Sequence, residues 1–250
     1  MKRFNFICTL VCALLSLFGS TAYADTSNLI KDQVTVTITD GKYLSELIDE
    51  NVAPRITNLK IVGVIDGTDI LYLRELLGVG RKPFVEKENI KSNLQILDLS
   101  DAYIREGGMT YCEGKLSGRA YNIYTHNNEI GQNMFASCHS LKKITLPHSI
   151  TSIELAAFSN CSELEEIIKF ENITKIRSGA FNNCSKLKEF KLPKLQELEA
   201  STFEGCESLI SLEIPEGITT LPKAFAQGLS LIHISEPTRL LSASRMPSSA

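Results

Sequence analysis

A phenylalanine followed three residues later by a cysteine or glycine recurs along the second half of the chain, and this recurrence constrains the fold more than any other feature. Successive phenylalanines lie 23, 23, 22 and 22 residues apart. A near-constant period of this length is typical of proteins built from stacked repeats. The five segments are FASCHSL at Phe135, FSNCSEL at Phe158, FNNCSKL at Phe181, FEGCESL at Phe203 and FAQGLSL at Phe225.

Each repeat carries more apolar residues than it could bury on its own. One unit opens with an LxxIxL-type stretch (Leu141, Ile144, Leu146) and continues with two apolar residues three apart (Ile150, Ile153) before the phenylalanine corner. Stacked units would cover one another's open faces and form a continuous core. We therefore predict that the LxxIxL stretches align as a parallel sheet with a strand spacing of ~4.8 Å, and that the phenylalanines form an interior column on the other side.

This pattern resembles the leucine-rich repeat proteins of the BspA-like type, whose consensus is roughly LxxIxIPxxVxxIxxxAFxxC. The resemblance covers residues 141–228, and NLQILDLSDAYI at 93–104 is similar to an earlier unit. It implies an α/β repeat fold, namely a leucine-rich-repeat solenoid with a parallel sheet on its concave face and an α/β N-terminal cap. It also implies a bacterial cell-surface protein that adheres to host or neighbouring-cell proteins.

The first 24 residues have the pattern of a secretory signal peptide. A basic start precedes an apolar run from Phe6 to Phe18, and Ala22, Tyr23 and Ala24 form a small-residue cleavage site. The run is shorter than the ~20 residues that cross a bilayer. We therefore expect a secreted or cell-surface protein without a transmembrane segment.

The net charge of the chain is −3. Removal of Lys2 and Arg3 with the leader leaves 26 − 2 = 24 basic against 29 acidic residues, a net charge of −5. Because the sequence has no basic stripe, we expect no nucleic-acid partner.

We divide the remaining chain into a cap at 25–91, repeats at 92–228 and a tail at 229–250. In the cap, VTVTIT (34–39) and NLKIVGVI (58–65) are typical of strands, GKYLSELIDE (41–50) has helical spacing, and a second helix is expected from Asp66 or Thr68 to Gly78. The tail begins LSLIHISEPTR, which is similar to a frame translation of a sequencing adapter, so we interpret it as foreign sequence.

An insertion at 105–130 interrupts the repeats. Insertions in solenoids map to loops, and ordered loops often bind partners. Its tyrosines, Tyr111, Tyr121 and Tyr124, are candidate contact residues. The alternative is a structural excursion that closes the cap.

The cysteines Cys138, Cys161, Cys184 and Cys206 recur at one position of the repeat. Repetition favours packing over catalysis, because a catalytic thiol is needed once, and free cysteine behaves as a small buried hydrophobe. Disulfide pairing and reactivity are the alternatives.

The other chemical patterns are weak. Neither Cys138 with His139 and His148 as a metal site nor Cys112 with His126 as a dyad is supported by a known motif. We expect no metal, no cofactor and no catalytic residue.

The strand positions that face away from the core are the main binding candidates. Charges alternate along one of the three ladders, so cross-strand pairs could simply support the stack. The functional interpretation is a mixed-charge surface for a protein or other macromolecular ligand. Two alternatives stay open: the repeat part of an exported enzyme whose catalytic module lies beyond residue 228, and a structural envelope component. The ladders are Lys142, Glu165, Lys188 and Ile210; Lys143, Glu166, Glu189 and Ser211; and Thr145, Ile168, Lys191 and Glu213.

Overall fold

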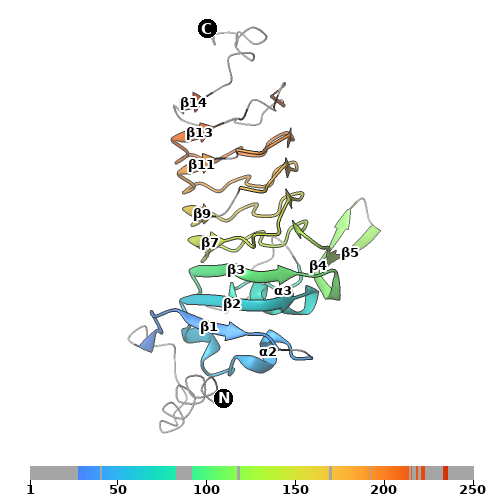
Figure 1. The fold of residues 1–250 in the computed structure, drawn as a ribbon, viewed down its shortest axis with the longest axis vertical. Coiled ribbons are helices and arrows are strands. Elements are labelled where there is room, and N and C mark those ends of the chain that lie inside the picture. Colours follow the sequence, from blue (N-terminus) through green and yellow to red (C-terminus); the bar gives the residue numbers. More distant parts are fainter. Residues whose placement is uncertain are drawn as a thin grey trace.

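The structure of the protein is a computed structural model that describes residues 28–222 and 233–235, apart from residue 40 and residues 83–91, 117–118, 169–170, 192, 214, 216–217 and 219–220. The predicted signal peptide and most of the tail lie outside the described residues. The chain forms a column of stacked coils on an N-terminal cap, and a hairpin projects from the junction between them (Figure 1).

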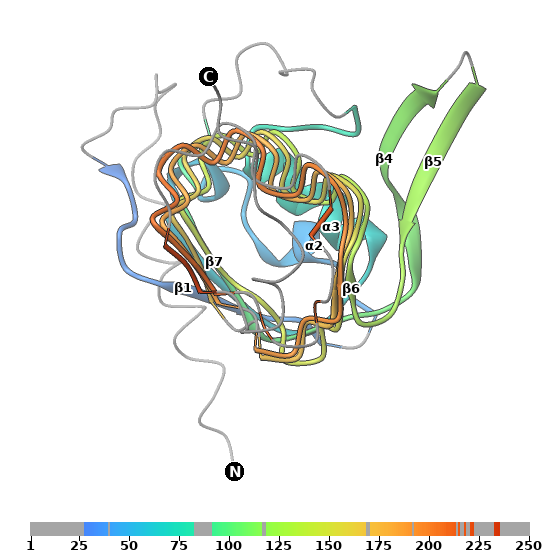
Figure 2. The ribbon, with the colours of Figure 1, turned by 90° about the horizontal axis from the view of Figure 1, so that it is seen from above.

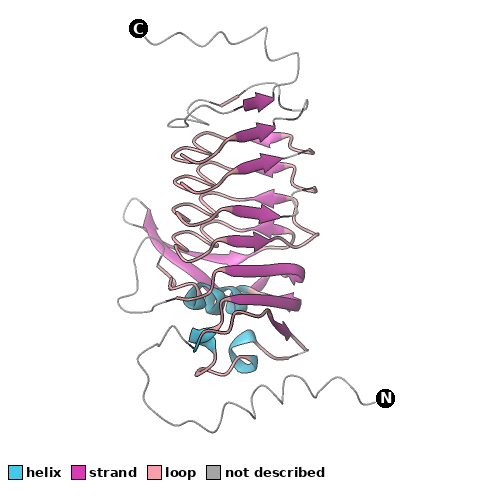
Figure 3. Cartoon of the chain, turned by 90° about the vertical axis from the view of Figure 1, so that its left-hand side faces the viewer, coloured by secondary structure: helices cyan, strands magenta, loops and turns pink. Residues whose placement is uncertain are grey.

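Strands form most of the regular structure, and the helices lie in the cap (Figure 3). The cap and junction elements are β1 (Val34–Thr37), α2 (Leu44–Leu47), η2 (Ala53–Arg55), β2 (Asn58–Ile65), α3 (Gly67–Leu76), β3 (Ile96–Ile104), β4 (Gly107–Leu116) and β5 (Arg119–Thr125). The coil elements are β6 (Glu129–Ile130), β7 (Lys143–Thr145), β8 (Ser152–Ile153), β9 (Glu166–Ile168), β10 (Lys175–Ile176), β11 (Glu189–Lys191), β12 (Glu197–Leu198), β13 (Ser211–Glu213) and β14 (His233–Ser235).

The predicted parallel sheet is confirmed. Its strands run in the order β1-β2-β3-β7-β9, and β11-β13-β14 form a second parallel segment of three strands. Register is kept from coil to coil, so that Leu97 pairs with Ile144 and Ile144 with Ile167. These three residues are buried, which places the LxxIxL stretches against the core as predicted.

A further parallel sheet, which the sequence did not predict, lies on the opposite side of the coils. Its order is β12-β10-β8-β6, and Figure 2 shows β6 across the coil from β7. Each strand has two residues, of which the second points inward, as at Ile153 and Ile176. The apolar pair of each repeat therefore supplies a second ladder.

The corners form the predicted interior column. The rings of Phe135, Phe158, Phe181 and Phe203 are fully buried. Neighbouring rings stack with centroids 5.4, 5.4 and 5.6 Å apart. Corner amides donate to carbonyl oxygens of the next coil: Phe135 N to Ala157 O (2.8 Å), Phe158 N to Ala180 O (2.8 Å) and Phe181 N to Thr202 O (3.0 Å).

The cysteine column packs beside the rings. The five described cysteines are buried and free, which confirms the packing interpretation. Three thiols also donate to the phenylalanine carbonyl of the preceding coil: Cys161 Sγ to Phe135 O (2.9 Å), Cys184 Sγ to Phe158 O (3.2 Å) and Cys206 Sγ to Phe181 O (3.1 Å).

The cap contains the predicted strands and helices. Helix α3 begins at Asp66, whose carboxylate accepts from Thr68 N (2.9 Å), while the Asp69 carboxylate accepts from Asp66 N (3.2 Å). This reciprocal capping box stabilises the helix start. The helix ends before Gly78, which has a φ of 82° that glycine adopts without strain.

The insertion is a β-hairpin, although its sequence was expected to form a loop. Strands β4 and β5 pair antiparallel, with an irregular register between Gly107 and Cys112. The irregularity follows two glycines at positive φ, Gly107 and Gly108. These glycines hide the strand pattern because they interrupt the alternation of apolar and polar residues.

One side chain of the cap and one of the hairpin complete the hydrogen bonding of the first corner. Gln132 and Met134 occupy the same repeat positions as Leu155 and Ala157 of the next coil. The carbonyl groups of Leu155 and Ala157 accept hydrogen bonds from backbone amides of the preceding coil. The first coil has no preceding corner. Instead, Tyr111 Oη donates to Gln132 O (2.9 Å) and Arg74 Nη1 donates to Met134 O (2.9 Å).

The backbone of β14 pairs in register with β13. Residues 233–235 lie in the tail that we interpret as foreign sequence. That interpretation stays a prediction, and sequencing the gene across residue 229 tests it.

Candidate functional site

The outward side chains of β7, β9, β11 and β13, together with the residue before each strand, make up the surface that we call the strand face. Within each strand the middle residue is buried, as at Ile144 and Phe190, and its neighbours point outward. Because the strands are in register, equivalent outward residues form ladders across the coils. The strand face comprises Lys142, Lys143, Thr145, Glu165, Glu166, Ile168, Lys188, Glu189, Lys191, Ile210, Ser211 and Glu213, and each is exposed or half-buried.

Opposite charges on neighbouring coils pair across this face. Lys143 Nζ lies 2.7 Å from Glu166 Oε2, and Lys191 Nζ lies 3.1 Å from Glu213 Oε1. Lys188 Nζ lies 2.5 Å from Glu165 Oε2, and this hydrogen bond lowers the pKa of the Glu165 carboxyl. Exposed pairs of this kind contribute at most about 1 kcal/mol each.

The strand face also presents an aliphatic side chain. Ile210 is 59% exposed, the largest exposure among the exposed large hydrophobic side chains of the described chain. It lies directly before β13, in the ladder that contains Lys188. The C-terminal part of the face therefore combines charged residues with an apolar contact point.

The three insertion tyrosines differ in their accessibility. Tyr111 is fully buried, and burial raises the pKa of its hydroxyl well above the usual value. It therefore belongs to the junction described above and is not offered to a partner. Tyr121 is half-buried and Tyr124 is 45% exposed, so these two keep accessible surface.

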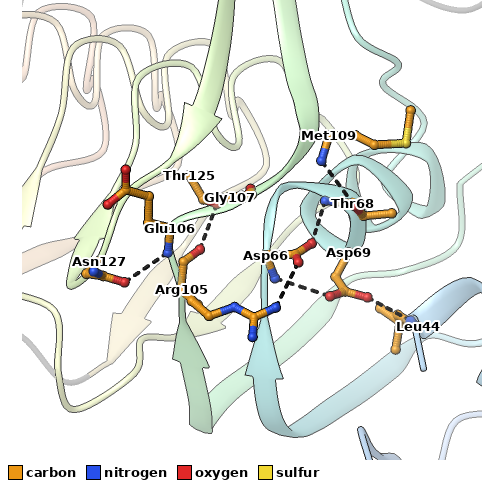
Figure 4. Close-up of polar contacts among 10 residues, drawn as sticks. All are labelled: Leu44, Asp66, Thr68, Asp69, Arg105, Glu106, Gly107, Met109, Thr125 and Asn127. Atoms are coloured by element: carbon orange, nitrogen blue, oxygen red, sulfur yellow. Dashed lines mark hydrogen bonds and ion pairs between the residues drawn. The ribbon is translucent and has the colours of Figure 1, made fainter. Parts of the chain in front are cut away.

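The base of the hairpin is fixed to the start of α3 (Figure 4). Arg105 Nη2 donates to the buried Asp66 carboxylate at 3.2 Å, and Met109 N donates to Thr68 Oγ1 at 3.1 Å. Thr125 Oγ1 lies within 2.8 Å of the carbonyl oxygens of both Arg105 and Gly107.

Close packing also limits side chains at this base. A Cβ on Gly67 would lie 2.1 Å from Met109 O. This contact requires glycine at the first position of α3. The base of the hairpin is therefore packed directly against the start of α3.

The buried thiols are unsuited to nucleophilic chemistry. Burial raises the pKa of Cys138 and Cys206 to about 12 and raises that of Cys161, Cys184 and Cys112 as well. A thiol attacks as its thiolate, so these groups are held in the unreactive form.

In the part of the chain that the structure describes, no three His, Cys, Asp or Glu side chains gather where they could hold a metal ion. Among the described helices, none has the length and apolar character needed to cross a bilayer.

Comparison with known proteins identifies a repeat family. The family model described as "BspA type Leucine rich repeat region (6 copies)" matches residues 112–242, about half of the chain. No curated protein matches the sequence.

Three solved structures are similar to parts of the chain. The T. pallidum leucine rich repeat protein TpLRR is 27% identical with a TM-score of 0.39, over 41% of this chain and 49% of its own. A leucine rich cell surface protein from Faecalibacterium prausnitzii A2-165 is 19% identical with a TM-score of 0.43, over 86% of this chain and 63% of its own. The pneumococcal vaccine antigen PcpA is 20% identical with a TM-score of 0.40, over 73% of this chain and 47% of its own. The chain thus spans less than two thirds of each of these structures.

Proposed function

Because the chain belongs to the BspA-type leucine-rich repeat family, we propose that it is an exported, non-catalytic protein that binds a protein or other macromolecular ligand through its strand face. The observation that carries the proposal is the register of this face. Outward side chains of successive coils form continuous ladders, so a ligand can contact several coils at once. Extended surfaces of this kind are how solenoids usually bind partners.

The composition of the strand face indicates how such a ligand is held. Six of its charged residues form pairs between coils, whereas Ile210 is exposed and can pack against an apolar group. The face has no Trp, Tyr or Arg among its twelve residues, and those types dominate the strongest binding sites. We therefore expect modest affinity for each coil and adhesion through many weak contacts.

Export and surface display are part of this proposal. They are supported by the signal-peptide pattern at 1–24 and by the match to the BspA-type repeat, since the resemblance to BspA-like proteins implies display at a bacterial surface. A mature N-terminus at Asp25, read by N-terminal sequencing of protein from the medium or the cell surface, supports export. Full-length protein retained in the cytoplasm contradicts it.

The binding test compares two charge-matched triple variants in adhesion to intact host or neighbouring cells. One variant replaces Lys142, Lys143 and Lys188 of the strand face with Glu. The control replaces Lys175, Arg177 and Lys186, which lie outside the strand face, with Glu. We expect the first variant to lose adhesion and the control to keep it. Equal adhesion by both variants and the wild type, with each folded by circular dichroism, contradicts the strand face as the binding site.

One observation favours a second candidate function. The ion pairs of the strand face join neighbouring coils, which is what a purely architectural envelope component needs. In that case the first variant lowers the unfolding temperature and the wild type shows no saturable adhesion.

A further inference from the structure

Strand β5 has an open edge. In the described part of the chain, β5 pairs with β4 and with no other strand. The far edge of β4, by contrast, is partly covered, because Glu113 N donates to Arg81 O at 2.7 Å. An open edge presents a row of backbone donors and acceptors to any other extended chain.

The backbone groups at this edge can be assigned. Ile123 O accepts from Thr110 Oγ1 of β4 at 3.0 Å, so the polar groups of Ile123 point into the hairpin. Successive residues of a strand turn their N–H and C=O groups to opposite sides. Asn122 and Tyr124 therefore direct theirs to the open edge, and both residues are exposed.

The sequence of β5 lacks the features that usually prevent edge-to-edge pairing. Natural edge strands are protected by lysines, prolines, bulges or short length. The seven residues RAYNIYT contain no lysine, proline or glycine, and two tyrosines, an isoleucine and a threonine favour strands. The register irregularity of the hairpin lies near its base, in β4.

The hairpin also holds β5 away from the coils. Figure 2 shows β4 and β5 extending outward beside the column, and the base is fixed by the Asp66–Arg105 and Thr68–Met109 contacts. The open edge of β5 therefore projects beside the column, and it is already a formed strand before any pairing.

We propose that the open edge of β5 pairs antiparallel with β5 of a second copy of this chain, forming a four-stranded sheet across a two-fold axis. Charge favours this occupant. Arg119 is the only charged residue of β5 and lies at its first position. In an antiparallel pair centred on Asn122, each Arg119 position lies opposite Thr125 of the other copy, so the two charged positions are at opposite ends of the shared edge. The arrangement is self-complementary and closes at two copies.

The test uses Asn122→Pro in the chain as exported, beginning at Asp25. Proline removes one outward N–H and leaves the hydrogen bonds between β4 and β5 in place. The matched control, Asn122→Thr, changes the same side chain and keeps the N–H. Sedimentation equilibrium should give a dimer for the wild type and for Asn122→Thr, and an at least about tenfold higher dimer dissociation constant for Asn122→Pro.

A wild-type protein that stays monomeric over the whole concentration series overturns the proposal. So does a dimer that Asn122→Pro leaves unchanged. If Asn122→Pro fails to fold, hydrogen exchange of the wild type decides the question: the amides of Asn122 and Tyr124 should exchange slowly when the protein is concentrated and rapidly when it is dilute. Exchange that is independent of concentration also overturns the proposal.

Discussion

The guanidinium group of Arg74 donates hydrogen bonds from Nη1 to the backbone carbonyl of Met134 at 2.9 Å and to that of Asn133 at 2.7 Å. Arg74 is fully buried, and its Nε and Nη2 donate to Gly80 O. A helix of the cap thus supplies the donors that a preceding coil would supply elsewhere in the column. Hydrogen bonds from the Arg74 side chain to the backbone carbonyl groups therefore close the first corner, in addition to apolar contacts.

Arg74→Met should destabilise the protein by roughly 2 to 5 kcal/mol, because it leaves buried carbonyl groups without donors. Denaturant unfolding measures the change. The same substitution at Arg177, which is half-buried and paired with Glu154 and Glu199, is the control and should cost about 1 kcal/mol or less. Equal effects at the two sites would show that Arg74 does not close the column.

Tyr111→Phe should cost about 1 to 3 kcal/mol, because Gln132 O loses its donor in a buried site. Tyr124→Phe removes the same hydroxyl from an exposed tyrosine of the same hairpin and should leave the unfolding free energy unchanged. Thermal or denaturant unfolding of the two variants distinguishes the roles. A neutral Tyr111→Phe would contradict the assignment of Tyr111 to the junction.

Each corner places two residues in the left-handed region, and the side chain at the first of them differs between coils. Ala156 has a φ of 52° and its equivalent Gly179 has a φ of 61°. Gly179→Ala adds about 1 to 2 kcal/mol of backbone strain, of which the reduced freedom of the unfolded chain offsets about 0.4 to 1 kcal/mol, so a net destabilisation is expected. A Cβ at this position meets its nearest neighbour at 3.8 Å, so a clash adds nothing to this cost.

The substitution Ala156→Gly relieves the backbone strain at the equivalent position of the preceding coil. It also gives the unfolded chain more conformational freedom, which cancels about 0.4 to 1 kcal/mol of the stability gained. It should therefore stabilise the protein slightly. Opposite signs for the two substitutions are expected from denaturant unfolding, and destabilisation by Ala156→Gly would refute the backbone assignment.

The buried thiols predict a loss of stability at alkaline pH. The pKa of Cys138 and Cys206 is raised by burial from the usual 9.0 to about 12. Between these values the unfolded chain releases thiol protons that the folded chain keeps, so the unfolding free energy falls as pH rises. Below pH 9 the contribution of both groups is fully present.

Unfolding curves between pH 8 and pH 11 measure this effect. The double variant Cys138→Ala, Cys206→Ala should be less stable at pH 8, and its unfolding free energy should fall less steeply as the pH rises.

Alkylation counts the free thiols directly: the unreduced mature protein should bind five alkyl groups after denaturation and almost none while folded. Fewer than five after denaturation would indicate disulfides.

Much of this architecture is predictable because its signals repeat. The residues that recur at Phe135, Phe158 and Phe181 identify the corner. Asp66 and Thr68 were both candidates for the start of α3, and the structure has the N-cap at Asp66. The strand face follows from the same periodicity, since residues on either side of an inward Ile or Leu must point outward.

The remaining features depend on contacts that occur once. Arg74 bonds to residues about 60 positions later, and nothing in its sequence neighbourhood distinguishes it from a surface arginine. Tyr111 was expected at a binding surface because a Gly- and Asn-rich insertion usually lies on the outside. The second sheet was missed because strands of two residues are too short to show alternation.

Hydrogen exchange at the corners tests the central claim, which is that neighbouring coils complete one another's hydrogen bonding around a shared core. The amides of Phe135, Phe158 and Phe181 belong to no helix or strand, yet each donates to the next coil. We predict that these amides exchange as slowly as those of the parallel sheet. Exchange within seconds, as in unstructured turns, would contradict the stacked-coil account.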